Sequence, residues 1–124
     1  MLLECRRVAH IGALMHFSVI LPAPELSPSA YHEAIETGPP FTDAPDGYEP
    51  LLDESHWRIV DRIDVSGEYQ RTLQSLVDGL NRNAAEIRKI FGDEFDSHRQ
   101  HREDQIGLVQ RGVLRREVFV ARAI

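Results

Sequence analysis

The stretch GEYQRTLQSLVDGLNRNAAEIRKIFG, residues 67–92, decides the fold. Its apolar side chains recur at steps of three and four, which predicts one long amphipathic helix. Gly92 is placed to end this helix. Gly79 weakens it by about 1 kcal/mol relative to alanine, and a break near Gly79–Asn83 is left open. The apolar stripe consists of Tyr69, Leu73, Leu76, Val77, Leu80, Ala84, Ile87, Ile90 and Phe91.

Shorter elements surround the long helix. Alternating apolar residues predict strands at 16–21 and 57–65, and Ser27-Pro28 predicts the start of a short helix that runs to Glu36. Residues 105–110 and 113–124 are expected to form two more strands. The second of these should be interior, because residues 118–121 are apolar on both faces. Residues 1–14 form either an N-terminal extension or a first strand, Leu2–Ile11.

These elements together predict a single domain, residues 1–124, of the α+β class. We expect a mainly antiparallel sheet of about four or five strands that packs one face on the long amphipathic helix. The short helix should lie at an end of the sheet or alongside it.

The amino-acid composition disfavours several classes of function. Asp and Glu number 20 against 14 Lys and Arg, and the net charge of −6 disfavours binding to a nucleic-acid backbone. Cys5 is the only cysteine, so no intramolecular disulfide is expected. No apolar run approaches the roughly 18 residues that a membrane span needs, and a membrane partner is not expected. A cytoplasmic location is the default.

The residues that carry chemistry form no recognisable motif. His98 and His101 would share a face of a helix, but arginines beside them repel a metal ion. Cys5 could be a nucleophile only with a base beside it, and His10 and His16 are near it in sequence alone. Asp61 and Asp64 could act as an acid–base pair, but ion pairs with nearby arginines explain them as well. There is no glycine-rich phosphate loop. We therefore predict no catalytic residue, no cofactor and no metal site, and the balance of these observations is against an enzyme.

The connection from residue 38 to residue 56 is the best candidate for a binding surface, because long connections tend to be functional or disordered. Its aromatic residues resemble interface anchors, and its carboxylates would steer a basic partner. The alternative is that the aromatic side chains fold back onto the core. The predicted partner-binding residues are Phe41, Asp43, Asp46, Tyr48, Glu49 and Trp57.

The order of elements is similar to a family of small bacterial α+β domains of unknown function. The resemblance covers residues 15–124. It implies no catalytic residues, and because some such domains look like partners of toxins, it favours protein binding. The segments that carry the resemblance are Phe17–Leu21, Leu26-Ser-Pro, Gly47, Trp57–Ile63 and Leu73–Phe91.

Three classes of function are weighed on these grounds. The first is a small acidic protein-binding module, such as an immunity or inhibitor protein of bacterial or phage conflict systems, with a basic protein as its partner. The second is a small-ligand-binding protein or small enzyme with a pocket between sheet and helix. The third is an oligomeric structural or assembly subunit. The first is preferred, and a homodimer is left open.

Overall fold

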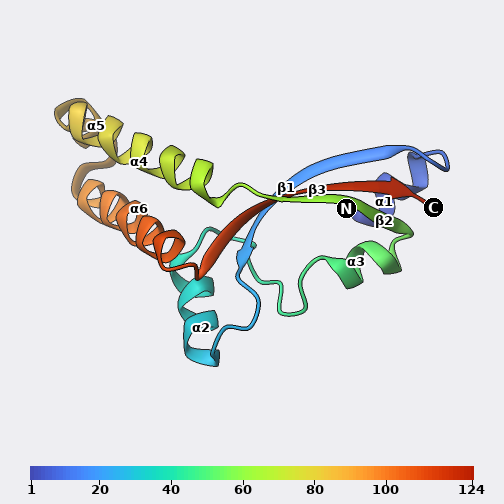
Figure 1. Ribbon diagram of the computed structural model, residues 1–124. Coiled ribbons are helices and arrows are strands. Elements are labelled where there is room, and N and C mark those ends of the chain that lie inside the picture. Colours follow the sequence, from blue (N-terminus) through green and yellow to red (C-terminus); the bar gives the residue numbers. More distant parts are fainter.

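The computed structural model describes all residues, 1–124, and has the predicted α+β class (Figure 1). None of its helices combines the length and the apolar character needed to cross a membrane. In chain order the elements are α1 (Leu2–Val8), β1 (Leu14–Pro22), α2 (Pro28–Thr37), α3 (Glu49–Glu54), β2 (Trp57–Asp64), α4 (Ser66–Arg82), α5 (Ala84–Phe91), the 3₁₀ turn η1 (Gly92–Glu94), α6 (Phe95–Gln110) and β3 (Leu114–Ala123).

The sheet has three strands in the order β1-β3-β2, and both outer strands pair antiparallel to β3. The interior position predicted for residues 118–121 is confirmed, because they lie in β3. The antiparallel sheet is also confirmed, but the expected four or five strands are too many. Residues 105–110 end helix α6, and most of the proposed strand Leu2–Ile11 forms helix α1.

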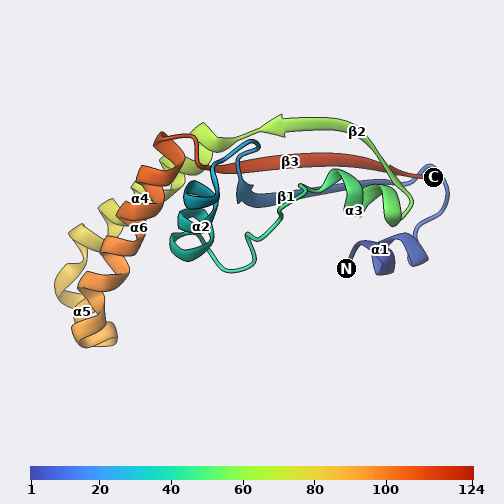
Figure 2. The same ribbon diagram turned by 90° about the horizontal axis from the view of Figure 1, so that it is seen from below.

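One face of the sheet is covered by α1 and α3 (Figure 2). The core on this face contains Leu52 from α3, Trp57 from β2 and Phe119 from β3, all buried. Leu2 and Cys5 of α1 pack against it. Residues 2–8 are therefore a helix that covers this face, so the expected first strand is wrong. The alternative, an N-terminal extension, stays a prediction.

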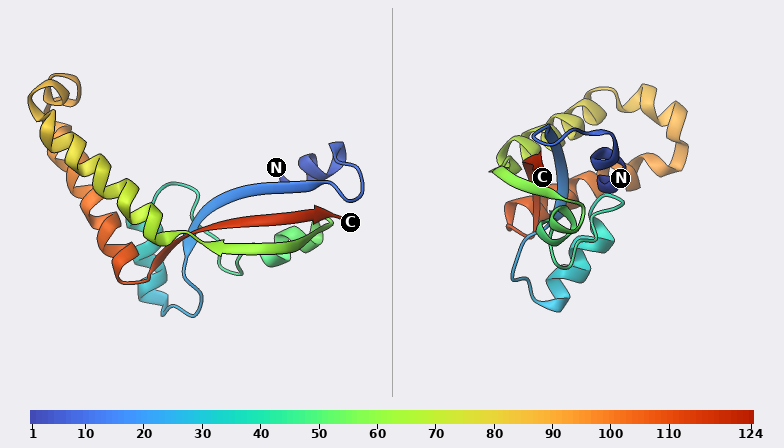
Figure 3. Two further views of the ribbon diagram at one scale, coloured as in Figure 1. Left: turned by 45° about the horizontal axis from the view of Figure 1, so that its top comes forward. Right: turned by 90° about the vertical axis from the view of Figure 1, so that its right-hand side faces the viewer.

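The long helix is present but leaves the sheet. It is divided at Asn83 into α4 and α5, so the break near Gly79–Asn83 is confirmed. The segment from α4 to α6, residues 66–110, forms a helical hairpin that projects from one end of the sheet (Figures 1 and 3). Only Val65 separates β2 from α4, so the helix continues outward from the strand and cannot turn back over its face.

A second core joins this hairpin to α2 and to the start of β3. Leu73 and Val77 of α4 are buried there together with Val109 of α6. Tyr69 of the predicted stripe is buried there as well, and Leu80, Ala84 and Ile87 are half-buried, whereas Leu76 is 47% exposed and Ile90 is 79% exposed. The expected packing of the long helix on a face of the sheet is therefore wrong, because the helix projects from the end of the sheet and packs mainly on α6.

The short helix α2 begins where the sequence predicts. The Ser27 hydroxyl oxygen accepts a hydrogen bond from the backbone N–H of Ala30 at 3.1 Å, and Pro28 occupies the first helical position. Gly38 follows its last residue. This helix lies at the same end of the sheet as the hairpin (Figure 1).

Candidate functional site

The topology indicates where a ligand would bind. Because β1 and β2 are both antiparallel to β3, they run parallel to each other and their carboxyl ends lie at the same end of the sheet (Figure 1). Open sheets that contain parallel strands bind ligands in the crevice beyond those carboxyl ends. In this protein α2 and the start of the helical hairpin stand around that end.

A cavity of about 540 Å³ opens beside the end of β1, within the range of small-molecule sites. We call it the β1-end cavity. Its walls come from the end of β1 and the turn after it, from α2, from the loop before α3, and from Arg62 of β2. The residues that line it are Leu21, Pro22, Ala23, Pro24, Glu25, Leu26, Tyr31, Ala44, Pro45, Asp46, Gly47, Glu49, Pro50 and Arg62.

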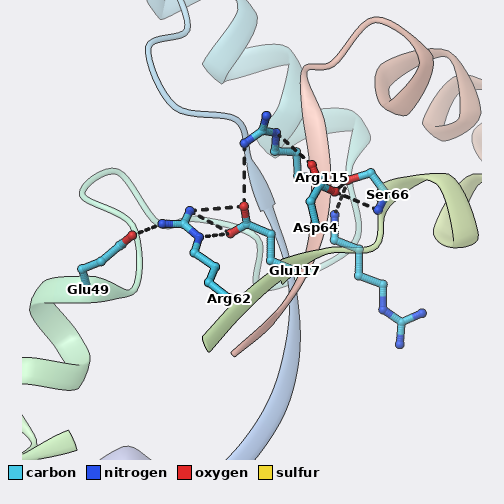
Figure 4. A network of polar contacts seen from close by, with 7 residues as sticks. Glu49, Arg62, Asp64, Ser66, Arg115 and Glu117 are labelled. Carbon is cyan, nitrogen blue, oxygen red and sulfur yellow. Dashed lines mark hydrogen bonds and ion pairs between the residues drawn. The ribbon is translucent and has the colours of Figure 1, made fainter. Parts of the chain in front are cut away.

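Arg62 is held in place from two sides (Figure 4). Its Nε donates to Glu117 Oε2 at 3.1 Å and its Nη2 donates to the same oxygen at 2.9 Å, while Nη1 donates to Glu49. Burial acts to lower the pKa of the Arg62 guanidinium, but Glu117 and Glu49 raise it above the usual range. The guanidinium therefore stays charged, and its donors are taken up by carboxylates of the chain itself.

Glu117 is the buried centre of this network, with 3% of its surface exposed. It lies on β3 between Arg116 and the apolar run 118–121. It receives a second guanidinium, because Arg115 Nη1 lies 3.7 Å from Glu117 Oε1. A buried carboxylate needs such partners, since an uncompensated charge in the interior is strongly destabilising.

Asp64 lies in the same network of polar contacts, at the end of β2 and just before α4 (Figure 4). Its Oδ1 accepts hydrogen bonds from the backbone N–H and the hydroxyl of Ser66, at 2.9 and 2.5 Å. These bonds, against the opposing effect of burial, lower the pKa of Asp64 from its ordinary value of 3.8. The Ser66 hydroxyl also accepts from the backbone N–H of Arg116 at 3.1 Å, which ties the start of the hairpin to β3.

Tyr31 of α2 forms the opposite wall of the β1-end cavity. Its hydroxyl donates to Asp43 in the loop between α2 and α3. Desolvation and then this hydrogen bond raise the pKa of the Tyr31 phenol, and Asp46 adds to the effect. The phenol therefore stays protonated at neutral pH and fixes the loop against α2.

The structure separates the residues predicted to bind a partner. Asp46 and Glu49 line the β1-end cavity, and Asp43 lies beside it on Tyr31. Phe41 stands alone in solvent, 98% exposed. Their role in binding a basic protein stays a prediction.

The other two aromatic residues, Tyr48 and Trp57, fold onto the core, as the alternative interpretation predicted. Tyr48 packs its ring on Phe17 and Phe119, with ring centroids 6.0 and 5.8 Å apart. Trp57 is buried and donates its indole N–H to the Leu2 carbonyl oxygen at 3.1 Å.

Sequence reasoning missed Tyr31, Arg62 and Glu117. Glu117 did carry a signal, because a carboxylate beside the apolar run 118–121 of an interior strand requires a buried cation. Arg62 was noticed only as a neighbour of Asp61 and Asp64. Nothing in the local sequence of Tyr31 distinguishes it from an ordinary helix residue.

The remaining candidates lie apart from the cavity. His98 packs its ring on Phe91 at 4.6 Å, and His101 contacts the Gln105 side chain at 3.1 Å. Cys5 packs against the α1 side of the sheet core. No group of three or more His, Cys, Asp or Glu side chains is arranged to hold a metal ion.

Solved structures with the same fold include methyltransferases. The chain is similar to a putative sarcosine dimethylglycine methyltransferase from Galdieria sulphuraria, with TM-score 0.84 and 15% identity over 98% of this chain and 45% of that one. It is similar to phosphoethanolamine N-methyltransferase 2 from Haemonchus contortus, crystallised with phosphomonomethylethanolamine and S-adenosylhomocysteine, with TM-score 0.78, 10% identity and coverage of 98% and 29%.

A third similar structure is the cyclopropane synthase MmaA2 from Mycobacterium tuberculosis, with TM-score 0.79 and 13% identity over 98% of this chain and 48% of that chain. This chain therefore spans less than half the length of each of the three structures. No protein-family profile and no curated protein sequence matches it.

These similarities show that the fold of this chain also occurs within the larger chains of these three proteins. They overturn two expectations. The resemblance to small bacterial domains of unknown function was wrong, because nearly the whole chain superposes on the methyltransferase-like fold. The preferred function, a protein-binding immunity or inhibitor module, is contradicted by the same finding. The misreading arose because short strands, a capped helix and a long helix are common to many α+β folds.

Proposed function

We propose that this chain is the substrate-side part of an S-adenosylmethionine-dependent enzyme that modifies a small molecule, most simply by methyl transfer. The observation that carries the proposal is the likeness of 98% of the chain to enzymes whose names include small-molecule N-methyltransferases. Folds host many functions, so the proposal also depends on the β1-end cavity, which stands where ligands bind in sheets of this kind.

In this proposal each part of the chain has a distinct task. The end of β1 and the loop before α3 form the binding surface for the small molecule. The network of Arg62, Glu117 and Glu49 keeps one wall of that surface rigid, which a site needs if it is to hold its ligand in a productive orientation. The helical hairpin is a wall beyond the end of the sheet.

The cofactor does not fit on these residues alone. Doubly wound folds hold nucleoside cofactors on a glycine-rich turn between a strand and a helix, where the backbone approaches the ligand closely. The described chain has no such turn. We therefore assign cofactor binding to another part of the enzyme, in the same polypeptide or in a partner. S-adenosylmethionine, when bound there, would supply an electrophilic methyl group.

The two edges of the sheet support this division. The β2 edge is disrupted by an irregularity between Ile59 and Asp61 and carries Arg58, Asp61, Arg62 and Asp64; bulges and charges of this kind keep other strands away. β1 pairs with β3 through nine regular positions and carries no Asp, Glu, Lys or Arg. An edge without protection is one that accepts a further strand, so we place the rest of the enzyme's sheet beside β1.

The finer expectations belong to the same proposal. A cytoplasmic location suits an enzyme of small-molecule metabolism. The predicted absence of nucleic-acid partners agrees with the acidic composition, and a homodimer stays open.

Methyl transfer by the native protein tests the function. A tag on the native gene allows the chain to be purified from its own cells with whatever completes it. The preparation is incubated with methyl-tritiated S-adenosylmethionine and a small-molecule extract of the same cells. We expect tritium in the small-molecule fraction, suppressed by excess S-adenosylhomocysteine. Tritium no higher than with boiled protein would overturn the proposal.

A further inference from the structure

We propose that the β1-end cavity binds a small organic cation, such as a protonated or quaternary amine. The inference rests on the proposed function, because it names the class of small molecule that the enzyme would hold. An amine bound there as a cation must lose its proton before its nitrogen can accept a methyl group, and a quaternary amine would be bound as a product. It is drawn from the charge and shape of the cavity itself.

The cavity has the size and composition of a small-ligand site. Its volume of about 540 Å³ is lined by apolar side chains and prolines from the end of β1 and the loop before α3, as is usual for such sites. Three carboxylates line it: Glu25 from the turn after β1, Asp46 from the loop, and Glu49 from the start of α3. They come from three separate segments, so the fold and not the local sequence brings them together.

Arg62 is the single cationic residue in the lining, and it does not neutralise all three carboxylates that a ligand would meet. Arg62 gives two of its nitrogens to the buried Glu117 and a third to Glu49. Its charge is therefore neutralised inside the chain, and its donors are engaged. An anionic ligand would have to displace a carboxylate from Arg62, whereas a cationic one meets Glu25 and Asp46, for which no ion pair is formed.

Tyr31 adds an aromatic surface to the same cavity. Tyr31 lines the cavity, and its hydroxyl is engaged by Asp43. Aromatic rings attract ammonium groups through the negative potential of their faces. Carboxylates around one aromatic wall thus favour a cation over a neutral molecule of the same shape.

Titration with choline tests the inference. Choline is compared with 3,3-dimethylbutan-1-ol, which has the same shape without the charge, by following backbone amide resonances of the native protein in NMR spectra. We expect choline to shift the amides of Ala44, Asp46 and Gly47 in a saturable way, and the alcohol to need at least about tenfold higher concentration for the same shifts. Equal shifts with both compounds, or none with choline, would overturn the inference.

Variants show whether the carboxylates carry the preference. Glu25→Gln with Asp46→Asn should weaken choline binding about tenfold, the sum of two partly exposed charge interactions of about 0.7 kcal/mol each. The matched control is Glu103→Gln, an exposed carboxylate on α6, which should not change it. Unchanged binding in the double variant would contradict the inference. If the protein binds S-adenosylmethionine but not choline, only this inference is wrong. If it binds choline but not S-adenosylmethionine, only the proposed function is wrong.

Discussion

A single buried carboxylate organises the candidate site. Glu117 has 3% of its surface exposed and neutralises Arg62, which in turn holds Glu49 at the rim of the β1-end cavity. The side chain of Arg62 is itself 37% exposed. Solvent therefore screens part of this interaction, and its energy is below that of a fully buried pair.

Removing the charge of Glu117 should destabilise the protein. We expect Glu117→Gln to lower the free energy of unfolding by about 1–3 kcal/mol, less than for a fully buried pair because Arg62 reaches solvent. Urea denaturation measures the change. In the exposed pair of Glu68 with Arg71, Glu68→Gln should cost no more than about 0.5 kcal/mol. Equal effects of the two substitutions would show that the network does not stabilise the fold.

Sequence reasoning identified some residues of the candidate site but did not predict how they are arranged in space. Asp46 and Glu49 were chosen because the long loop concentrates charge, and they do line the cavity. Their partners come from distant segments, such as Tyr31 on α2 and Glu25 after β1. Local patterns contain no information on such long-range contacts, so the loop was interpreted as a surface for a protein partner.

Among the elements, the helical hairpin is the one whose packing most needs a test. Leu73 is 1% exposed in the core shared with α6, whereas Leu76 on the same helix is 47% exposed. We expect Leu73→Ala to cost about 2–5 kcal/mol, as truncation of a buried leucine does. Leu76→Ala should change the free energy of unfolding by about 0.5 kcal/mol or less. Thermal or urea denaturation of both variants measures the difference.

The opposite order of the two effects would be informative. A large loss for Leu76→Ala and a small one for Leu73→Ala would mean that the other side of α4 is buried, and the arrangement of the hairpin would be wrong. In either case the pair compares the same substitution in one helix, so differences in helix propensity cancel.

Sequence periodicity predicted the elements with mixed success, for physical reasons. The strands around Phe17 and Val120, the capped helix at Ser27 and the broken long helix all follow from local patterns. Residues 105–110 were interpreted as a strand because Ile106, Leu108 and Val109 are apolar. No glycine or proline separates this segment from the polar helix before it, so the helix continues through Gly107 and buries Ile106 and Val109.

In the whole molecule, the sheet has one edge, at β2, that is protected against pairing with further strands, and one edge, at β1, that is open. The chain matches 98% of its own length, but 29–48% of the lengths of the three enzymes compared above. The edge strand β1 has no Asp, Glu, Lys or Arg and pairs regularly with β3, so this edge is open to a further strand. Sequence patterns could not show this, because an edge strand and an interior strand of that composition differ only in what lies beside them.

We propose above all that these residues work as part of an S-adenosylmethionine-dependent enzyme. Equilibrium dialysis of the natively tagged, purified protein against labelled S-adenosylmethionine tests it most directly. We predict saturable, stoichiometric binding that S-adenosylhomocysteine displaces and that ATP, which shares the adenosine group, does not. Failure to retain labelled S-adenosylmethionine, or displacement by ATP as readily as by S-adenosylhomocysteine, would contradict the claim.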